Sequence, residues 1–110
     1  MRPLSDDGAG KRVLRGAGFS RWGGWGDHRH PIQFSGDAVG NWEMLRFEVD
    51  LTTTSGNAGC FFWAHDIGGF YDGLDPELYT RWTQFGLLNS SLRIHSVVGE
   101  KSDRRPWLWG

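Results

Sequence analysis

Short apolar runs alternate along this chain with longer segments in which apolar residues recur at helical spacing. Each run is bounded by glycine, proline or polar residues, which is typical of a short buried strand. The candidate strands lie near Phe19–Arg21, Ile32–Ser35, Cys60–His65 and Leu92–His95, and the candidate helices near Asn41–Ser55 and Pro76–Leu88. This alternation predicts an α/β fold with parallel strands and with both helices on one face of the sheet.

The first candidate helix is marked by its N-terminus and by one apolar stripe. Asn41 has a side chain suited to the N-cap position. Trp42, Leu45 and Val49 follow at positions i, i+3 and i+7, which predicts that they face the core. The Ser-Gly-Asn segment at 55–57 is expected to end the helix.

The second candidate helix has an equally clear start. Asp75 supplies a capping carboxylate, and Pro76 occupies the first helical position, where its missing N–H breaks no hydrogen bond. Leu78, Trp82 and Phe85 recur at helical spacing and are expected in the core.

Length and composition narrow the possible classes. With 110 residues the chain holds one domain at most, whereas a complete α/β barrel normally needs about 250. The net charge of −1 gives no electrostatic reason to expect nucleic acid or an anionic membrane as a partner. The single cysteine, Cys60, lies in an apolar run and is expected in the core. The longest apolar stretch, 58–64, is shorter than the roughly 20 residues of a membrane helix, and residues 1–12 are polar, without the apolar region of a secretory signal, so we expect a soluble chain.

Polar side chains follow the ends of the candidate strands. These residues are Arg21, Asp37, Asp66 and His95. The carboxyl ends of parallel strands joined by right-handed crossovers meet at one edge of a sheet. We therefore expect these four side chains to converge there.

Two carboxylates, a guanidinium and an imidazole among aromatic side chains suit a sugar, because the polar groups bind hydroxyls and the aromatic faces cover the apolar faces of the ring. The aromatic residues of this region are Trp22, Trp25, Phe34, Trp63 and Phe70. Acetal hydrolysis needs a proton donor to the leaving oxygen and a carboxylate on the other side of the anomeric carbon. Asp37, which follows Phe-Ser-Gly, is the best candidate for the donor.

Several longer motifs carry a family resemblance. They are Ser-Arg-Trp-Gly-Gly at 20–24, His-Arg at 28–29, Pro-Ile at 31–32, Phe-Ser-Gly-Asp at 34–37, Trp-Ala-His-Asp-Ile-Gly-Gly at 63–69, Asp-Pro-Glu-Leu-Tyr-Thr-Arg-Trp at 75–82, Arg-Ile-His-Ser at 93–96 and Arg-Pro-Trp at 105–107. In this order and spacing the chain resembles the glycoside hydrolases of family 31. The resemblance implies a retaining α-glycosidase, of the α-glucosidase or α-xylosidase type, with a (β/α)₈ TIM barrel and no cofactor.

The resemblance also implies which part of that barrel is present. Residues 13–110 match the C-terminal half, roughly barrel strands five to eight, behind a polar lead-in at residues 1–12. The implied partners are a carbohydrate substrate and the rest of the barrel, with no nucleic acid and no membrane.

The matching motifs assign roles to individual residues. Asp37 corresponds to the catalytic acid/base, and Arg93 to a residue that orients the carboxylates of the site. The residues expected to contact the sugar are Arg21, Asp66 and His95 through hydrogen bonds and Phe34, Phe70 and Trp63 through their rings.

The chain departs from the family pattern at the nucleophile. In the family this aspartate lies in a motif of the Trp-x-Asp-Met-Asn type on an earlier strand, and nothing before Arg21 resembles it. Asp6 and Asp7 lie in the polar lead-in and are not substitutes. The isolated chain is therefore predicted to be inactive.

Three interpretations remain open from the sequence. The chain is a fragment of a family 31 catalytic domain, a degenerate module that binds carbohydrate without turnover, or a half-barrel completed by another chain. We favour the fragment, because Asp37 and the sugar-binding set are intact. A metal site built from His28, His30, His65 and Asp66 is disfavoured, because their spacing fits no zinc motif.

Overall fold

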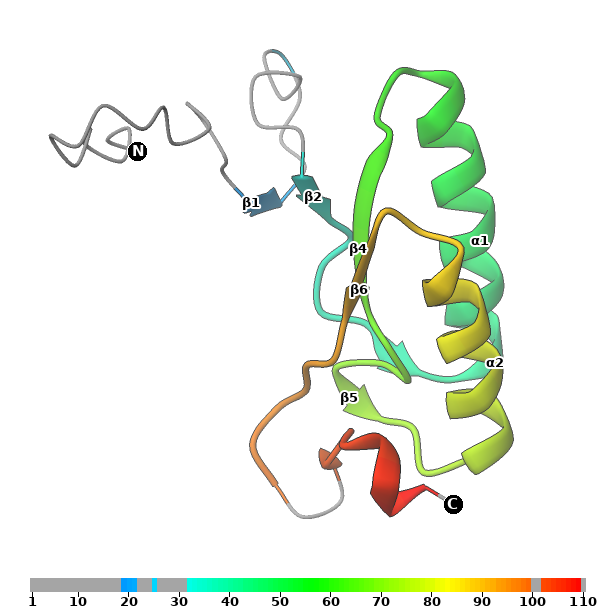
Figure 1. The fold of residues 1–110 in the computed structure, drawn as a ribbon, viewed down its shortest axis with the longest axis vertical. Helices are drawn as coiled ribbons and strands as arrows, with labels where there is room; N and C mark the ends of the chain where they lie inside the picture. Colours follow the sequence, from blue (N-terminus) through cyan, green and yellow to red (C-terminus); the bar gives the residue numbers. More distant parts are fainter. Residues whose placement is uncertain (1–18, 22–24, 26–31, 100–101, 110) are drawn as a thin grey trace, which may run out of the picture.

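The computed structural model describes residues 19–21, 25, 32–99 and 102–109, and every structural statement below concerns these residues (Figure 1). Along them the elements are β1 (Phe19–Arg21), β2 (Ile32–Phe34), β3 (Val39–Gly40), α1 (Trp42–Asn57), β4 (Phe62–Asp66), β5 (Tyr71–Asp72), α2 (Pro76–Leu87), β6 (Ser91–Arg93) and the 3₁₀ segment η3 (Pro106–Leu108). No helix in these ranges is long and apolar enough to cross a membrane.

The main sheet has the strand order β1-β2-β4-β6, and all neighbouring strands are parallel. Its register places Phe34 beside Ala64 and Asp66 beside Arg93. The predicted parallel strands are thereby confirmed, with shifted ends: β4 extends to Asp66 and β6 stops at Arg93.

The expectation that the third apolar run is buried throughout was wrong. Trp63 to Asp66 are buried, but Phe61 and Phe62 are 68% and 47% exposed. The helices cover one face of the sheet, and at the start of β4 no described element covers the other. Cys60 is half-buried, not part of the core.

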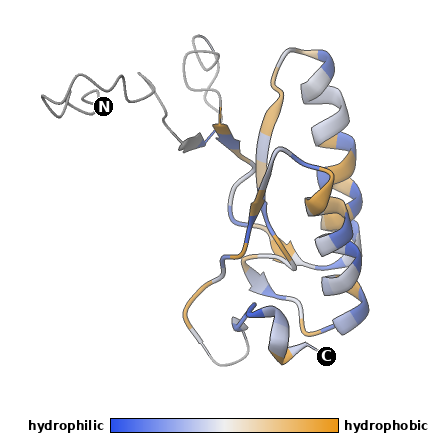
Figure 2. Cartoon of the chain, in the orientation of Figure 1, coloured by the Kyte–Doolittle hydropathy of each residue, from blue (hydrophilic) through white to orange (hydrophobic). Residues whose placement is uncertain are grey.

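Both helices lie on one face of the main sheet, as predicted (Figure 1). The ring of His65 in β4 shows this directly, because it contacts Thr52 of α1 and Phe85 of α2. The core between these layers is made of Leu45, Ile67, Leu78, Tyr79 and Trp82. Hydrophobic and hydrophilic residues are interleaved along both helices, as expected of elements buried on one side only (Figure 2).

Both predicted N-caps are present. The Asn41 side chain accepts a hydrogen bond from the Met44 amide at 2.8 Å, and the Asp75 side chain accepts one from the Glu77 amide at 2.9 Å. Each cap satisfies an amide that lacks a partner within its helix, which fixes where the helix begins.

The buried face of α1 differs from the predicted one. Trp42 is 47% exposed and Val49 is 39% exposed, whereas Leu45 and Glu48 are buried. The helical period was predicted correctly, but the face is rotated toward Glu48. Glu48 is buried because it has polar partners on the sheet, at Ser35 and His65, and on α2, at Trp82. The spacing of apolar residues along the helix does not reveal such partners.

A second, smaller parallel pair joins β3 to β5 and was not predicted. It depends on close backbone approach: a Cβ on Gly40 would lie 2.4 Å from the carbonyl oxygen of Gly68. Arg104, near η3, is buried and donates to the carbonyl oxygens of Gly69 and Asp72. This arginine thereby fixes the loop that follows β4.

Candidate active site

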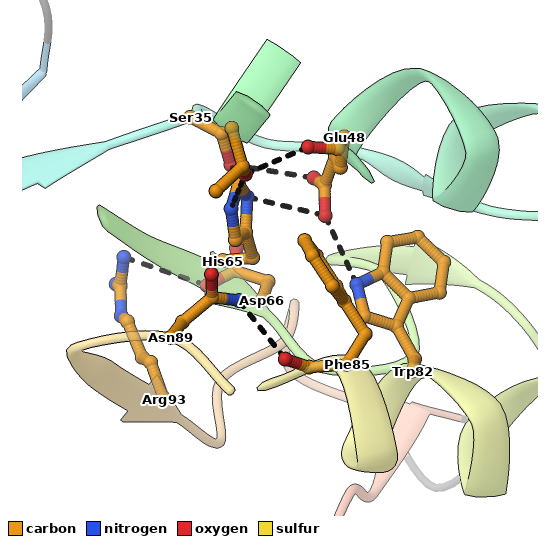
Figure 3. Close-up of polar contacts among 9 residues, drawn as sticks. Ser35, Glu48, His65, Asp66, Trp82, Phe85, Asn89 and Arg93 are labelled. Atoms are coloured by element: carbon orange, nitrogen blue, oxygen red, sulfur yellow. Dashed lines mark hydrogen bonds and ion pairs between the residues drawn. The ribbon is translucent and has the colours of Figure 1, made fainter. Parts of the chain in front are cut away.

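Asp66 is the last residue of β4, and its side chain is fully buried. Nη1 of Arg93, on the neighbouring strand β6, lies 3.4 Å from its Oδ1 (Figure 3). Within the described ranges, neither carboxylate oxygen of Asp66 accepts a hydrogen bond. Most buried polar atoms in proteins have such a partner, so this carboxylate has unused capacity to accept hydrogen bonds from a ligand.

The electrostatic surroundings of Asp66 agree with that view. Burial raises its pKa from the ordinary value of 3.8 to about 7, because desolvation disfavours the charged form. The positive charge of Arg93 opposes this shift, and the negative charge of Asp37 adds to it. Two carboxylates therefore act on each other at this end of the sheet.

Asp37 lies three residues after β2, and its side chain is exposed. Its charge acts on His95 as well as on Asp66. The pKa of His95 is lowered, first by burial and then by Arg93, while Asp37 opposes the shift. The ring of Phe70 lies 5.2 Å from that of His95. These contacts gather residues from the ends of three strands around one acidic centre.

Two arginines and one aromatic ring complete the group. The guanidinium carbon of Arg93 lies 4.2 Å from the Phe34 ring centroid, and that of Arg21 lies 6.0 Å away. Gly36 has a φ of 104°, and a Cβ there would lie 2.5 Å from an Arg21 nitrogen. A larger residue at this position would displace Arg21 from the loop that carries Asp37.

The structure thus brings together the predicted site residues Arg21, Phe34, Asp37, Asp66, Phe70, Arg93 and His95. Trp63 does not join them, which corrects our expectation. Successive side chains of a strand point to opposite faces, so Trp63 and Asp66, three apart in β4, lie on different faces of the sheet. Trp63 stacks on His65, with ring centroids 5.9 Å apart, and donates to the Cys60 carbonyl.

The remaining candidates are placed as follows. Trp25 is fully exposed, and Trp22, His28 and His30 lie outside the described residues. Among the residues that the structure describes, no group of three or more His, Cys, Asp and Glu side chains is arranged to hold a metal ion. An open cavity of about 340 Å³ lies beside His95, lined by residues 94–99 and 102–105.

A polar cluster on the helix side of β4 was missed by the sequence reasoning (Figure 3). Nδ1 of His65 lies 3.2 Å from Oε2 of Glu48 and 2.9 Å from Oγ of Ser35. Nε2 of His65 lies 2.9 Å from Oγ1 of Thr52, and Nε1 of Trp82 donates to Oε2 of Glu48 at 2.9 Å. The available signal was the helical period itself, since Leu45, Glu48 and Thr52 also stand at i, i+3 and i+7.

The fold and the site together define a class of protein. Parallel strands are covered by helices on one face, and titratable residues converge at the carboxyl ends of the strands, which is the arrangement of active sites in β/α enzymes. The family model described as the glycosyl hydrolases family 31 TIM-barrel domain matches residues 5–110. The chain belongs to this family.

The relatives are glycosidases. An α-xylosidase of Emericella nidulans is 40% identical over 92 residues, covering 84% of this chain and 11% of the relative. α-Glucosidase 2 of Bacillus thermoamyloliquefaciens is 34% identical over 103 residues, covering 92% and 12%. A crystal structure of the glucosidase II alpha subunit, described as Glc1Man2-bound, superposes with a TM-score of 0.70 at 32% identity, covering 77% of this chain and 9% of that one. The chain thus spans about a tenth of the length of each.

Proposed function

We propose that this chain is part of the catalytic barrel of a retaining α-glycosidase that hydrolyses O-glycosidic bonds of α-glucosides or α-xylosides. These two substrate classes follow from the names of two relatives, an α-xylosidase and an α-glucosidase. The chain corresponds to roughly the fifth to eighth strands of the barrel, its C-terminal half, and the remaining strands belong to the same enzyme.

The observation that carries this proposal is the pairing of two unlike carboxylates. Asp66 is buried and has no hydrogen-bond donor among the described residues, whereas Asp37 is exposed and close enough to influence it. Such a pair suits a site where one carboxylate binds hydroxyl groups and the other exchanges protons with a leaving group.

In this proposal Asp37 donates a proton to the glycosidic oxygen and then removes one from water. Asp66, Arg21 and His95 bind the hydroxyl groups of the sugar, and Phe34 and Phe70 line the pocket. Arg93, paired with Asp66 and lying over Phe34, holds these groups in place. The nucleophile is a carboxylate of the missing strands, about 5–5.5 Å from Asp37 in a retaining enzyme. Asp66 does not replace it, because the matching family residue binds hydroxyl groups from the side of the ring.

The first test is to sequence the coding DNA upstream of Met1. An in-frame Trp-x-Asp motif supports a fragment of a larger enzyme, and its absence favours a degenerate carbohydrate-binding module. The isolated 110-residue chain should not hydrolyse aryl α-glucosides or α-xylosides, because acid catalysis alone supplies only about 10²–10⁴-fold. Turnover that disappears in Asp37→Asn would contradict this, since it requires a second carboxylate within the chain.

A second test concerns association. The half-barrel exposes sheet edges and apolar side chains, among them Phe61 and Phe62, which invite contacts between chains. We expect the isolated chain to oligomerise or aggregate in size-exclusion chromatography. A sharp monomer peak with cooperative thermal unfolding would show that the chain is a self-sufficient module.

A further inference from the structure

The polar cluster behind the sheet consists of Ser35, Glu48, Thr52, His65 and Trp82, and we call it the Glu48–His65 cluster. Glu48 and His65 are each about 1% exposed, so two titratable side chains are withdrawn from water where no sugar reaches them. A buried charge is costly unless it is paired and hydrogen-bonded.

The hydrogen bonds around the His65 ring indicate which of its two nitrogens carry protons. Thr52 donates its one hydroxyl proton to the Glu48 carbonyl oxygen at 2.7 Å, so it accepts from Nε2. Ser35 donates its one proton to Oε1 of Glu48 at 3.3 Å, so it accepts from Nδ1. Both ring nitrogens are thereby left to act as donors, which is the pattern of a protonated His65 paired with the Glu48 carboxylate.

The same contacts exclude a hydrolytic function for this cluster, although it contains Ser, His and Glu. In a catalytic triad the serine and the acid bond to opposite nitrogens of the imidazole. Here Ser35 and Glu48 both lie at Nδ1, and Nε2 is occupied by Thr52. The cluster is also closed to substrate by burial.

The position of the cluster relates it to the proposed active site. His65 directly precedes Asp66, and Ser35 is separated from Asp37 only by Gly36. Figure 3 shows Glu48 and Trp82 on one side of β4 and Arg93 reaching Asp66 on the other. Ser35 and His65 thus join the ends of β2 and β4 from behind, and Glu48 anchors both of them to α1 and α2.

We propose that Glu48 and His65 are positioning residues, a buried ion pair that sets the location of Asp37 relative to Asp66 at the carboxyl ends of β2 and β4. Where this positioning concerns catalysis, it rests on the proposed glycosidase function. Neither residue touches the sugar, and both act through the adjacent strand ends.

The first arm of the test observes the pair without any turnover. The complete enzyme, that is, this chain joined to the rest of the proposed barrel, is used in all three arms. Labelled with ¹⁵N at histidine, it should show two protonated ring nitrogens for His65, assigned by comparison with His65→Gln. In Glu48→Gln one of the two should lose its proton, because the compensating charge is gone. Glu43→Gln makes the same chemical change at an exposed site of α1 and should leave the ring unchanged. A neutral His65 ring in the unmodified protein would refute the ion pair.

The second arm follows the Asp66 carboxyl carbon by ¹³C NMR during a pH titration. The charged groups that act on Asp66 are Arg93, Asp37, Glu48 and His65, and Glu48 acts to raise its pKa more than His65 acts to lower it. Glu48→Gln should therefore lower the Asp66 midpoint, and Glu43→Gln should not. An unchanged midpoint would show that the two faces of β4 are not coupled.

The third arm is kinetic and uses the same complete enzyme. A misplaced acid should lower kcat/KM by about 10²-fold for poor leaving groups and far less for activated aryl glycosides. A loss of folded protein would instead reduce the measured rates for all substrates by the same factor. Equal losses, or none, in Glu48→Gln would overturn the positioning role. An unmodified enzyme without turnover would refute the glycosidase function, and the two NMR arms would then decide the coupling.

Discussion

His65 and Asp66 are adjacent in β4, and both side chains are buried, yet their surroundings are opposite in kind. On the helix side both ring nitrogens of His65 have partners, from α1 and from Ser35, which follows β2 directly. On the other side Asp66 has an ion pair with Arg93 but accepts no hydrogen bond within the described residues. A satisfied buried group maintains a structure, whereas an unsatisfied one is available to a ligand.

The two faces also differ in their effect on stability. The Glu48–His65 cluster is stabilising in context, because removing either partner leaves the other either charged and uncompensated or forced into its neutral form. The Asp66 face lowers stability, because its carboxylate is desolvated and the charge of Arg93 offsets only part of that cost. Functional sites commonly carry such a deficit.

The largest expected effect concerns the Asp66 side of the sheet, where the proposed active site lies. In the complete enzyme Asp37→Asn should lower kcat/KM by about 10²–10⁴-fold for substrates with poor leaving groups, because the proposed proton donor is lost. Activated aryl glycosides should lose least, since their leaving groups need little protonation. Initial rates over a series of leaving groups give the measurement. A loss that is independent of the leaving group would mean that Asp37 is not the acid.

The comparison between the faces is sharpened by making one chemical change on each. Glu48→Gln should lower the free energy of unfolding by about 3–5 kcal/mol, because it removes one partner of a buried pair. Asp66→Asn should raise the stability at pH 8, and on the proposed role of Asp66 it should also abolish sugar binding. Denaturant midpoints of the complete enzyme and its two variants test both. If the two substitutions destabilised equally, the distinction between the faces would fail.

Asp66 should also make the free energy of unfolding depend on pH. Its pKa is about 7 in the folded chain against 3.8 ordinarily, so between these values the folded state holds a proton that the unfolded state has released. The contribution of Asp66 to stability is therefore full below pH 3.8 and declines as the pH rises toward 7, by on the order of 4 kcal/mol. Unfolding midpoints between pH 4 and 8, compared with those of Asp66→Asn, isolate this slope. A slope that persists in Asp66→Asn would have to come from another group.

Local signals in the sequence predicted much of the fold. The caps Asn41 and Asp75 and the buried Trp82 are where the sequence places them, because capping and helical spacing depend on neighbours within a few residues. The parallel order of the main sheet follows from the alternation of helices and strands.

What was missed depends on partners far apart in the chain. Glu48 pairs with residues 13 to 34 positions away. The helical period alone aligns Glu48 with Leu45 and Thr52, but it does not reveal the distant partners that allow a charge to be buried there. The β3–β5 pair has two residues per strand, too few to show a period. Trp63 could have been placed correctly, since its spacing of three from Asp66 puts the two on opposite faces of a strand.

The smallest effect tests the two faces through tryptophan indoles. Trp82→Phe removes a buried donor to the Glu48 carboxylate and should lower the free energy of unfolding by about 1.5–3 kcal/mol, the usual value for hydrogen bonds to charged groups. Trp42→Phe removes a similar bond, from Nε1 to Oδ2 of Asp75 at 3.1 Å, but at an exposed position. There the carboxylate is rehydrated at once, so the loss should stay within about 0.5 kcal/mol. Denaturant midpoints of the complete enzyme measure both. If the two substitutions lowered the free energy of unfolding equally, the hydrogen bond from Trp82 to Glu48 would contribute no more than an exposed one. Glu48 would then not need its partner on α2.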